Sequence, residues 1–171
     1  MGQRIRREMM VTAVKYTEGT TEKTILLGER TPDSSIEYNH DIEVVTDVLG
    51  QTHGDINKTE PVQTFDPHSI IKDNDFDLYM YKAAMEDDLN KLNSAFDVYI
   101  ISAFIDEGTG SSHAYYTVKH TECTVLPTST GGEAYLGMPI EIHYSNKITK
   151  GTVNEISEEF TFTPAKEDAG L

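Results

Sequence analysis

The segment "FDVYIISAFI" at residues 96–105 is apolar on both faces of a β-strand. Successive side chains of a strand point to opposite sides, and the sets at even and odd positions here are Phe96, Val98, Ile100 and Phe104, and Tyr99, Ile101, Ala103 and Ile105. Both faces therefore need cover. We expect one face to fill the interior of a barrel or sandwich, and a helix or a neighbouring subunit to cover the other.

The rest of the chain also has the composition of β-strands, because stretches rich in Val, Ile, Thr, Tyr and Phe recur along it. The expected strands are residues 8–16, 23–28, 34–48, 62–65, 113–126, 138–145 and 158–163. Turn-forming stretches such as "GERTPDSS", "PTSTGGE" and "SNKITKG" separate them. The pattern predicts a mainly β fold, an antiparallel β-barrel or sandwich.

One segment has helical spacing instead. In "DFDLYMYKAAMEDDLNKLN", residues 75–93, apolar residues recur at intervals of three and four. Asp73, Asn74 or Asp75 can cap its amino end. The sequence therefore predicts one flanking α-helix at about residues 75–93.

At 171 residues the chain fits one domain with a core of its own. The expected division is a flexible amino-terminal arm at residues 1–8, a β-domain at 9–164 and a disordered tail at 165–171. Within the domain, "VLGQTHGDINKTEP" at residues 48–61 shows no hydrophobic period and predicts a long loop.

The charge is strongly acidic, with 14 Lys and Arg against 29 Asp and Glu, a formal net charge of −15. A protein that grips phosphates needs a basic face, so specific nucleic-acid binding is not expected. A local cluster of positive charge lies at the amino terminus of this acidic chain, formed by Arg4, Arg6 and Arg7. They either dock on the acidic surface of another copy or belong to a disordered terminus.

No catalytic or metal-binding motif stands out, so we expect no enzyme, no metal and no cofactor. The single cysteine, Cys123, excludes an intrachain disulfide and a thiolate metal site, and is expected to be a buried, inert thiol. Six histidines are scattered and are expected at the surface or at strand ends: His40, His53, His68, His113, His120 and His143. A loop site built on His53 and Asp55 is the weaker alternative.

The first ten residues, "MGQRIRREMM", have no apolar signal segment, and no run approaches the eighteen or so apolar residues of a membrane helix. We expect a protein that is made and kept in the cytoplasm unless a dedicated machine exports it, with no membrane partner.

Acidic residues fall on alternate positions over most of "PDSSIEYNHDIEVVTDV", residues 32–48. The members of this stripe are Asp33, Glu37, Asp41, Glu43 and Asp47. Alternation sends them to one face of a strand or hairpin, with a possible shift of phase near Asn39 and His40. On a single domain such a stripe is simply the solvent-exposed face of a sheet. If copies of the domain assemble around a shared axis, the stripe lines a negatively charged surface.

Two stretches resemble a known family. They are "ILLGERTPDSSIEYNHDIEVVTDVLGQT" at residues 25–52, and "GGEAYLGMPIEIHYSNKITKGTV" followed by "FTFTP" within residues 131–164. With the helix and the apolar strand between them, they are similar to the tail tube, or major tail, proteins of phages and phage-like particles from Gram-positive hosts. The resemblance covers most of residues 9–164 and departs at "SNK" after Tyr144, where a glycine is expected.

The resemblance implies a β-barrel or sandwich with one flanking helix, assembled as hexameric rings stacked into a hollow tube. Phage DNA passes through such a tube to the host without specific binding. The implied partners are other copies of the chain and the tape-measure, tail-terminator and baseplate or distal tail proteins. The implied location is the virion tail, after synthesis in the host bacterial cytoplasm.

Two sets of residues are the expected functional positions. Acids expected to face the lumen and repel DNA are Glu37, Asp41, Glu43, Asp47 and Glu141. Loop residues expected to contact the next ring or subunit are Gly50, Gln51, His53, Asp55, Asn57 and Lys58.

Two alternatives remain open on the sequence. One is the inner tube of a contractile phage tail or a phage-tail-like bacteriocin. The other is a monomeric ligand-binding β-sandwich, such as a carbohydrate-binding module. The absence of Trp disfavours the second, because such modules present exposed aromatic platforms.

Overall fold

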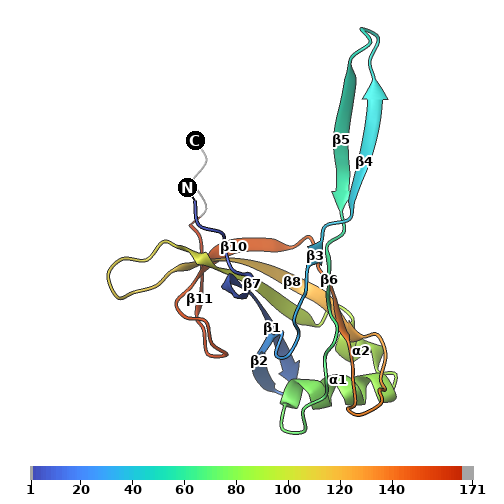
Figure 1. The fold of residues 1–171 in the computed structure, drawn as a ribbon, viewed down its shortest axis with the longest axis vertical. Coiled ribbons are helices and arrows are strands. Elements are labelled where there is room, and N and C mark those ends of the chain that lie inside the picture. The colour runs from blue at the N-terminus through green and yellow to red at the C-terminus, as the bar shows by residue number, and fades with distance from the viewer. Residues whose placement is uncertain (1, 167–171) are drawn as a thin grey trace.

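Long antiparallel strands bend around one helical layer in the computed structural model, which describes residues 2–166 (Figure 1). The strands are β1 (Met10–Glu18), β2 (Thr21–Leu27), β3 (Ile36–Glu37), β4 (His40–Thr46), β5 (Thr52–Thr59), β6 (Val62–Phe65), β7 (Phe96–Asp106), β8 (Tyr115–Pro127), β9 (Ile140–His143), β10 (Ile148–Val153) and β11 (Phe162–Pro164). The helices are α1 (Asp75–Met85), α2 (Leu89–Leu92) and a short 3-10 turn, Arg7–Met9. The predicted mainly β, antiparallel fold class is confirmed, and the sheet does not close into a barrel.

Strand β8 belongs to two sheets at once. Its first half pairs with β7 on one side and with β10 on the other, and its last four residues pair with β9. One sheet therefore runs β2-β1-β7-β8-β10-β11, and the second runs β8-β9-β6-β3. The two sheets share β8 as a hinge line, so its shape sets the angle between them.

A β-bulge produces the bend in β8. Between the pairs Phe96↔Cys123 and Val98↔His120, β8 has one residue more than β7, and Glu122 has a φ of 59°. A bulge of this kind bends the strand and increases its twist. The extra residue is tied down, because the Glu122 backbone N–H donates to Asp97 Oδ1 at 3.4 Å.

The main core fills the angle between the two sheets and α1. Helix α1 buries Phe76, Met80 and Ala83, and Asn74 caps its amino end by accepting from the Phe76 and Asp77 backbone N–H groups. The ring of Tyr16 packs edge-on against Phe76, with centroids 5.6 Å apart.

The helical segment is shorter than predicted. The chain leaves α1 at Met85, and Asp87 has a φ of 51°, a conformation that Asp tolerates better than most residues. A separate turn, α2, then places the buried Leu92 against the main core.

The second apolar face of β7 is covered by the carboxyl-terminal segment. Tyr99 and Ile101 pack in a smaller cluster with Val153, Phe160 and Phe162. The ring centroids of Phe160 and Phe162 lie 4.9 and 5.4 Å from the ring centroid of Tyr99, and both contacts are edge-on. The expectation that the helix or a neighbouring subunit covers this face is wrong, because α1 packs on the main core and residues of the same chain bury Tyr99.

A fully buried glutamine joins the two sheets. Gln63 on β6 accepts hydrogen bonds at Oε1 from Thr12 Oγ1 on β1 (3.1 Å) and from the Tyr144 hydroxyl (2.6 Å). Its Nε2 donates to Ser34 Oγ at 3.2 Å. Burial raises the pKa of Tyr144, so its hydroxyl stays a donor. The network ties β1 to β6 across the side of the core opposite β8.

Two segments expected to be irregular are strands. Residues 52–59 of the predicted 48–61 loop form β5, which pairs with β4. Both faces of this pair are exposed, so no buried side marks it with hydrophobic alternation. Most of the expected turn "SNKITKG" belongs to β10, whose Gly151 lets β11 approach: a Cβ there would lie 2.4 Å from Thr163 O.

The ends of the predicted domain also differ from expectation. Arg7, placed in a flexible arm, donates from Nε and Nη2 to Ser34 O at 3.0 and 2.7 Å, because the Arg7–Met9 turn lies beside that segment. Residues 2–6 have no regular structure. At the other end, the Ala165 N–H donates to Lys150 O, which extends the β10–β11 pairing. The remainder of the predicted tail, residues 167–171, lies outside the described residues.

We predict that Gln63→Leu lowers the free energy of unfolding by about 2–4 kcal/mol, because the Thr12 and Tyr144 hydroxyls lose their buried acceptor. Urea denaturation followed by circular dichroism measures the change. Gln51→Leu, at an exposed turn, is the matched control and should change stability by less than about 0.5 kcal/mol. Equal effects of the two substitutions would show that the network adds nothing to stability.

Candidate functional site

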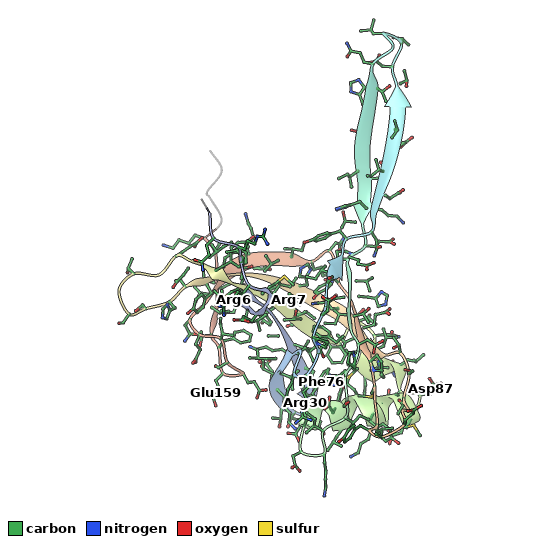
Figure 2. The ribbon with its side chains drawn as sticks, in the orientation of Figure 1. Arg6, Arg7, Arg30, Phe76, Asp87 and Glu159 are labelled. Atoms are coloured by element: carbon green, nitrogen blue, oxygen red, sulfur yellow. The ribbon has the colours of Figure 1, made fainter. Side chains whose placement is uncertain are left out.

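The β4–β5 hairpin stands clear of the rest of the molecule (Figure 1). We call residues 40–59 the arm. All residues of β4 and β5 are exposed, and the two strands pair with each other and with no other strand among residues 2–166. Its side chains project to both sides with no part of the body beside them (Figure 2). With seven residues in β4, at about 3.3 Å per residue, the paired strands are ~23 Å long.

One face of the arm is apolar. In the register Ile42↔Ile56 and Val44↔Gly54, directly opposed residues point to the same side. Ile42, Val44 and Ile56 are 57%, 64% and 58% exposed. The apolar surface continues to the tip, where Val48 and Leu49 are almost fully exposed.

The opposite face of the arm is acidic. Glu43 lies directly across from Asp55, and the pair Val45↔His53 follows it toward the tip. Like charges directly opposed across a strand pair destabilise it. Asn57 donates to Glu43 Oε2 at 3.4 Å, a weak contact that leaves both carboxylates unneutralised within the arm.

The tip of the arm is closed by Asp47. Its Oδ1 accepts from the backbone N–H groups of Leu49 (2.9 Å) and Gln51 (3.0 Å), and its Oδ2 lies 3.0 Å from His53 Nε2. The hydrogen bond to His53 and then those to the turn hold the pKa of Asp47 below its ordinary value. Gly50, with a φ of 78°, makes the turn.

The predicted contact residues therefore lie together on the arm, on strand and turn rather than on a loop. Gly50 and Gln51 form the turn at its tip, and His53, Asp55, Asn57 and Lys58 lie along β5. The opposite charges of Asp41 and Lys58 face each other at its base, next to a bulge at Asn57.

The predicted acidic stripe is split between two surfaces. Asn39 has a φ of 50° and donates to the backbone oxygens of Glu37 and Glu60, which breaks the strand between β3 and β4. Asp41, Glu43 and Asp47 consequently lie on the arm, and Glu37 lies on the body. The single continuous face expected from the alternation is wrong for this reason.

On the body, Glu37 and Glu141 share the outer face of the second sheet. Along β9, Glu141 and His143 point outward because they alternate with the buried Ile140 and Ile142. Glu37 pairs with Val62, which pairs with His143, so the Glu37 side chain points to the same face. A hollow of ≈ 280 Å³ beside them is lined by Asp33, Ser34, Ser35, Glu37, Val62, Thr64 and Asp66. We call Asp33, Glu37, Asp66 and Glu141 the acidic sheet face. Glu141 also pairs with His143 at 2.5 Å.

A basic and aromatic hollow lies on the outer face of the first sheet. It has a volume of ≈ 590 Å³ and is lined by Lys15, Tyr99, Lys119, Thr149, Phe160, Thr161, Phe162 and Pro164. Lys15 Nζ lies 5.5 Å from the Tyr99 ring centroid and 5.3 Å from that of Phe160, and Lys119 Nζ lies 5.6 Å from that of Tyr99. We call this hollow the lysine pocket. The sequence offered no sign of it, because five separate strands and a loop contribute to it.

Four of the six histidines each pair with a single carboxylate, whereas His40 contacts Thr59 Oγ1 and His120 contacts Ser145 O. The closest buried pair is His68 Nε2 and Asp77 Oδ1 at 2.6 Å, and Asp77 also accepts from the Ile71 N–H. His68 and His120 are buried, contrary to the surface positions expected for them. Within residues 2–166, no three His, Cys, Asp or Glu side chains come together to hold a metal ion, and no helix is long and apolar enough to cross a membrane.

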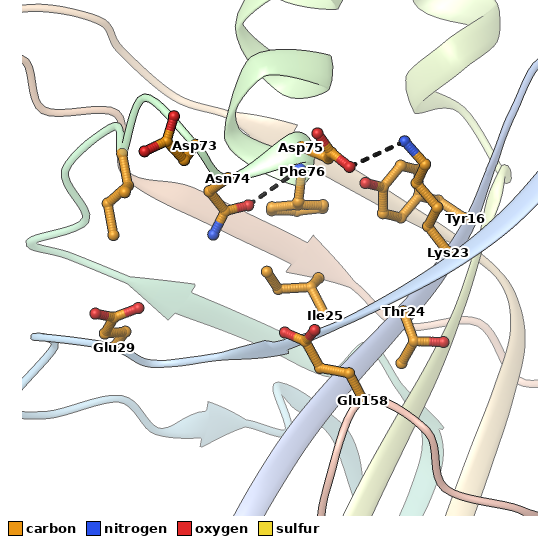
Figure 3. Close-up of a pocket in the computed structure, with 11 residues that line it drawn as sticks. Tyr16, Lys23, Thr24, Ile25, Glu29, Asp73, Asn74, Asp75, Phe76 and Glu158 are labelled. Atoms are coloured by element: carbon orange, nitrogen blue, oxygen red, sulfur yellow. Dashed lines mark hydrogen bonds and ion pairs between the residues drawn. The ribbon is translucent and has the colours of Figure 1, made fainter.

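A further hollow of ≈ 520 Å³ opens at the amino end of α1 (Figure 3). Lys23 reaches Asp75 at 3.1 Å and Glu18 at 2.9 Å, and these hydrogen bonds raise the pKa of Lys23. Burial raises the pKa of Tyr16 to about 12. Neither group can act as a base near neutral pH, and their contacts join β1 and β2 to the helix start.

The fold of the chain has a counterpart among solved structures. No family model and no curated protein matches the chain. The fold is similar to a structure described as the cryo-EM structure of the anti-feeding prophage cap, the tube-terminating cap. The match has 13% sequence identity and a TM-score of 0.45, and covers 89% of this chain and 93% of the other. At this score the likeness carries no inference about what this chain does.

We predict that His53→Gln raises the pKa of Asp47 toward its ordinary value, because the largest cause of its depression is the hydrogen bond to His53. Because the pKa of Asp47 is lower in the folded arm than in the unfolded chain, its carboxylate stabilises the tip fully at pH values above the unfolded-state pKa. This stabilisation is lost as the pH falls through the folded-state pKa. NMR titration of the Asp47 side-chain carbon measures the shift. His113→Gln, which removes the partner of Asp106 at 2.7 Å, is the control and should leave the Asp47 titration unchanged.

Proposed function

We propose that this chain is a structural protein that self-associates into stacked rings and forms the hollow tube of a phage tail, through which DNA passes. The resemblance found in the sequence suggested this role. The observation that carries the proposal is the arm, an exposed strand pair with an uncovered apolar face.

An isolated two-stranded hairpin is at best marginally stable in water. This arm also exposes Ile42, Val44 and Ile56 on one face and leaves the backbone groups on both outer edges without a neighbouring strand in the described chain. The body, by contrast, covers most of both faces of β7 with its own residues and leaves only the carboxyl end of that strand exposed. Burial of the arm against another copy of the chain would cover its exposed apolar face and its unpaired edges.

The acidic sheet face supplies the wall of the proposed tube. Glu37 and Glu141 lie on the outer side of the second sheet, and Asp33 and Asp66 line the hollow beside it. The chain as a whole has a formal net charge of −15. Repeated around a ring axis, such a face makes a bore of negative potential. This potential repels the DNA phosphates, so DNA passes through the bore without binding to its wall.

The remaining partners follow from the same role. Arg4 and Arg6, which are exposed beside the Arg7 anchor, extend the contact between copies onto acidic surface. Tape-measure, tail-terminator and baseplate or distal tail proteins bind the lumen and the ends of the tube in the virion. The protein acts there by assembly rather than by catalysis.

Removing the arm should abolish assembly while leaving the monomer folded. In the test variant, residues 41–58 are replaced by an Asn-Gly turn that joins His40 to Thr59, which already face each other. Negative-stain electron microscopy should show rings or tubes with a central hole for the unaltered protein and monomers for the variant.

A milder pair of variants controls for the deletion. Ile42→Ser with Ile56→Ser removes the two isoleucines of the apolar face and should prevent ring formation with little change in thermal stability, because both side chains are exposed. Thr46→Ser with Thr52→Ser, on the same face, should leave assembly intact. Normal tubes from the arm-deleted chain would contradict the proposal.

Reversing the charge of the acidic sheet face should make the tube hold DNA. Glu37→Lys with Glu141→Lys should assemble normally, and its tubes should bind double-stranded DNA with an affinity that falls as salt rises. Fluorescence anisotropy of labelled DNA with purified tubes measures the binding.

The control for this experiment carries the same change of charge elsewhere. Glu107→Lys with Glu155→Lys alters two exposed residues away from the acidic sheet face, and should leave DNA binding as weak as in the unaltered tubes. Equal DNA binding by both variants would show that the acidic sheet face does not line the bore.

A further inference from the structure

The arm presents an unbalanced charge as well as an apolar face. Glu43 and Asp55 are directly opposed, and Asp47 follows on the same side near the tip. The Asp47 carboxylate is satisfied by His53 and the turn, whereas Glu43 has one weak contact with Asn57. A cation beside Glu43 and Asp55 removes their mutual repulsion, so the partner surface of this face should be basic.

The lysine pocket has the matching chemistry. Lys15 and Lys119 point over Tyr99 and Phe160, and each has one loose carboxylate partner, Glu22 at 3.5 Å and Asp97 at 3.7 Å. The side chains of the two lysines are 24% and 27% exposed, so they are partly desolvated but reachable. The pocket of ≈ 590 Å³ combines cations with apolar rings.

The two surfaces also match in their apolar parts. On the acidic face of the arm, Val45 follows Glu43 and is 49% exposed, beside two carboxylates that extend from neighbouring strands. In the lysine pocket, Phe160 and Phe162 lie next to the two lysines. A mixed acidic and apolar strand pair is thus complementary to a mixed basic and aromatic hollow.

The arm of one chain does not serve its own pocket. Figure 1 shows the arm extending away from the body on the side opposite β11, whose residues Phe162 and Pro164 line the lysine pocket. The occupant must come from another copy.

We infer that Glu43 and Asp55 on the arm of one copy bind Lys15 and Lys119 in the lysine pocket of a second copy. This inference rests on the proposed self-association and names the two surfaces that meet. The contact neutralises the like-charged pair on the arm and covers the rings that pack on Tyr99. It also determines which face of the arm meets the pocket, since the two lysines attract the acidic face.

A charge exchange tests the contact. The arm variant carries Glu43→Lys and Asp55→Lys, and the pocket variant carries Lys15→Glu and Lys119→Glu. Each alone should associate about tenfold or more weakly than the unaltered chain, because like charges meet at the interface. Mixed in equal amounts, they should co-assemble, since each arm then finds a pocket of opposite charge on the other variant. A chain carrying all four substitutions should assemble by itself.

Sedimentation and electron microscopy measure assembly, and circular dichroism checks that each variant is folded. Glu107→Lys with Glu155→Lys carries the same change of net charge as the arm variant, and as its control it should assemble normally. Zero-length carbodiimide coupling of the unaltered assembly, followed by mass spectrometry, should join Lys15 or Lys119 to Glu43 or Asp55 between chains.

The outcomes separate this inference from the proposed function. If the unaltered chain assembles, but both charge-reversed variants also assemble alone and cross-links fall elsewhere, the contact is wrong and the tube proposal stands. If the unaltered chain forms no assembly at any concentration or salt, both are overturned. Failure of the mixture and of the fourfold variant to assemble, with all chains folded, also overturns the contact.

Discussion

The sharing of β8 by two sheets is the constraint on which the rest of the structure depends. A bulge at Glu122 bends this strand, so that β7 and β10 leave it in one sheet and β9 in another. The angle thus formed is filled by α1 and the main core. On the far side, the buried carboxamide of Gln63 holds β1 and β6 together with directed hydrogen bonds. Sheet angle, core and closure are therefore parts of one arrangement.

Because the main core and the carboxyl-terminal segment pack on opposite faces of β7, residues of the same chain cover most of its apolar side chains. Tyr99 and Ile101 on β7 would need a partner if the chain ended at β10, but Phe160 and Phe162 cover them. All apolar side chains of β4 and β5 are exposed, so the arm adds nothing to the core. The arm is therefore separate from the core of the body.

The charges follow the same division. A single residue in the left-handed conformation, Asn39, separates Glu37 on the sheet from Asp41 and Glu43 on the arm. Acids that are close in the sequence therefore lie on different surfaces, one on the body and the other on the arm. The lysine pocket, built from β1, β7, β8, β10 and the segment around β11, is a local exception on an acidic protein.

The sequence by itself determined the strand-rich class, a helix start within residues 73–75 and the two apolar faces of β7, because these depend on local alternation, spacing and capping. It also pointed to residues 48–61 as unusual, but not to their being a strand: both faces of β5 are in solvent, so no buried side imposes a period. Tertiary structure alone decided which segment covers Tyr99, how the acidic stripe divides and where Lys15 meets Lys119. Each of these depends on segments that are distant in the chain, and neither hydrophobic period nor charge spacing encodes which of them meet.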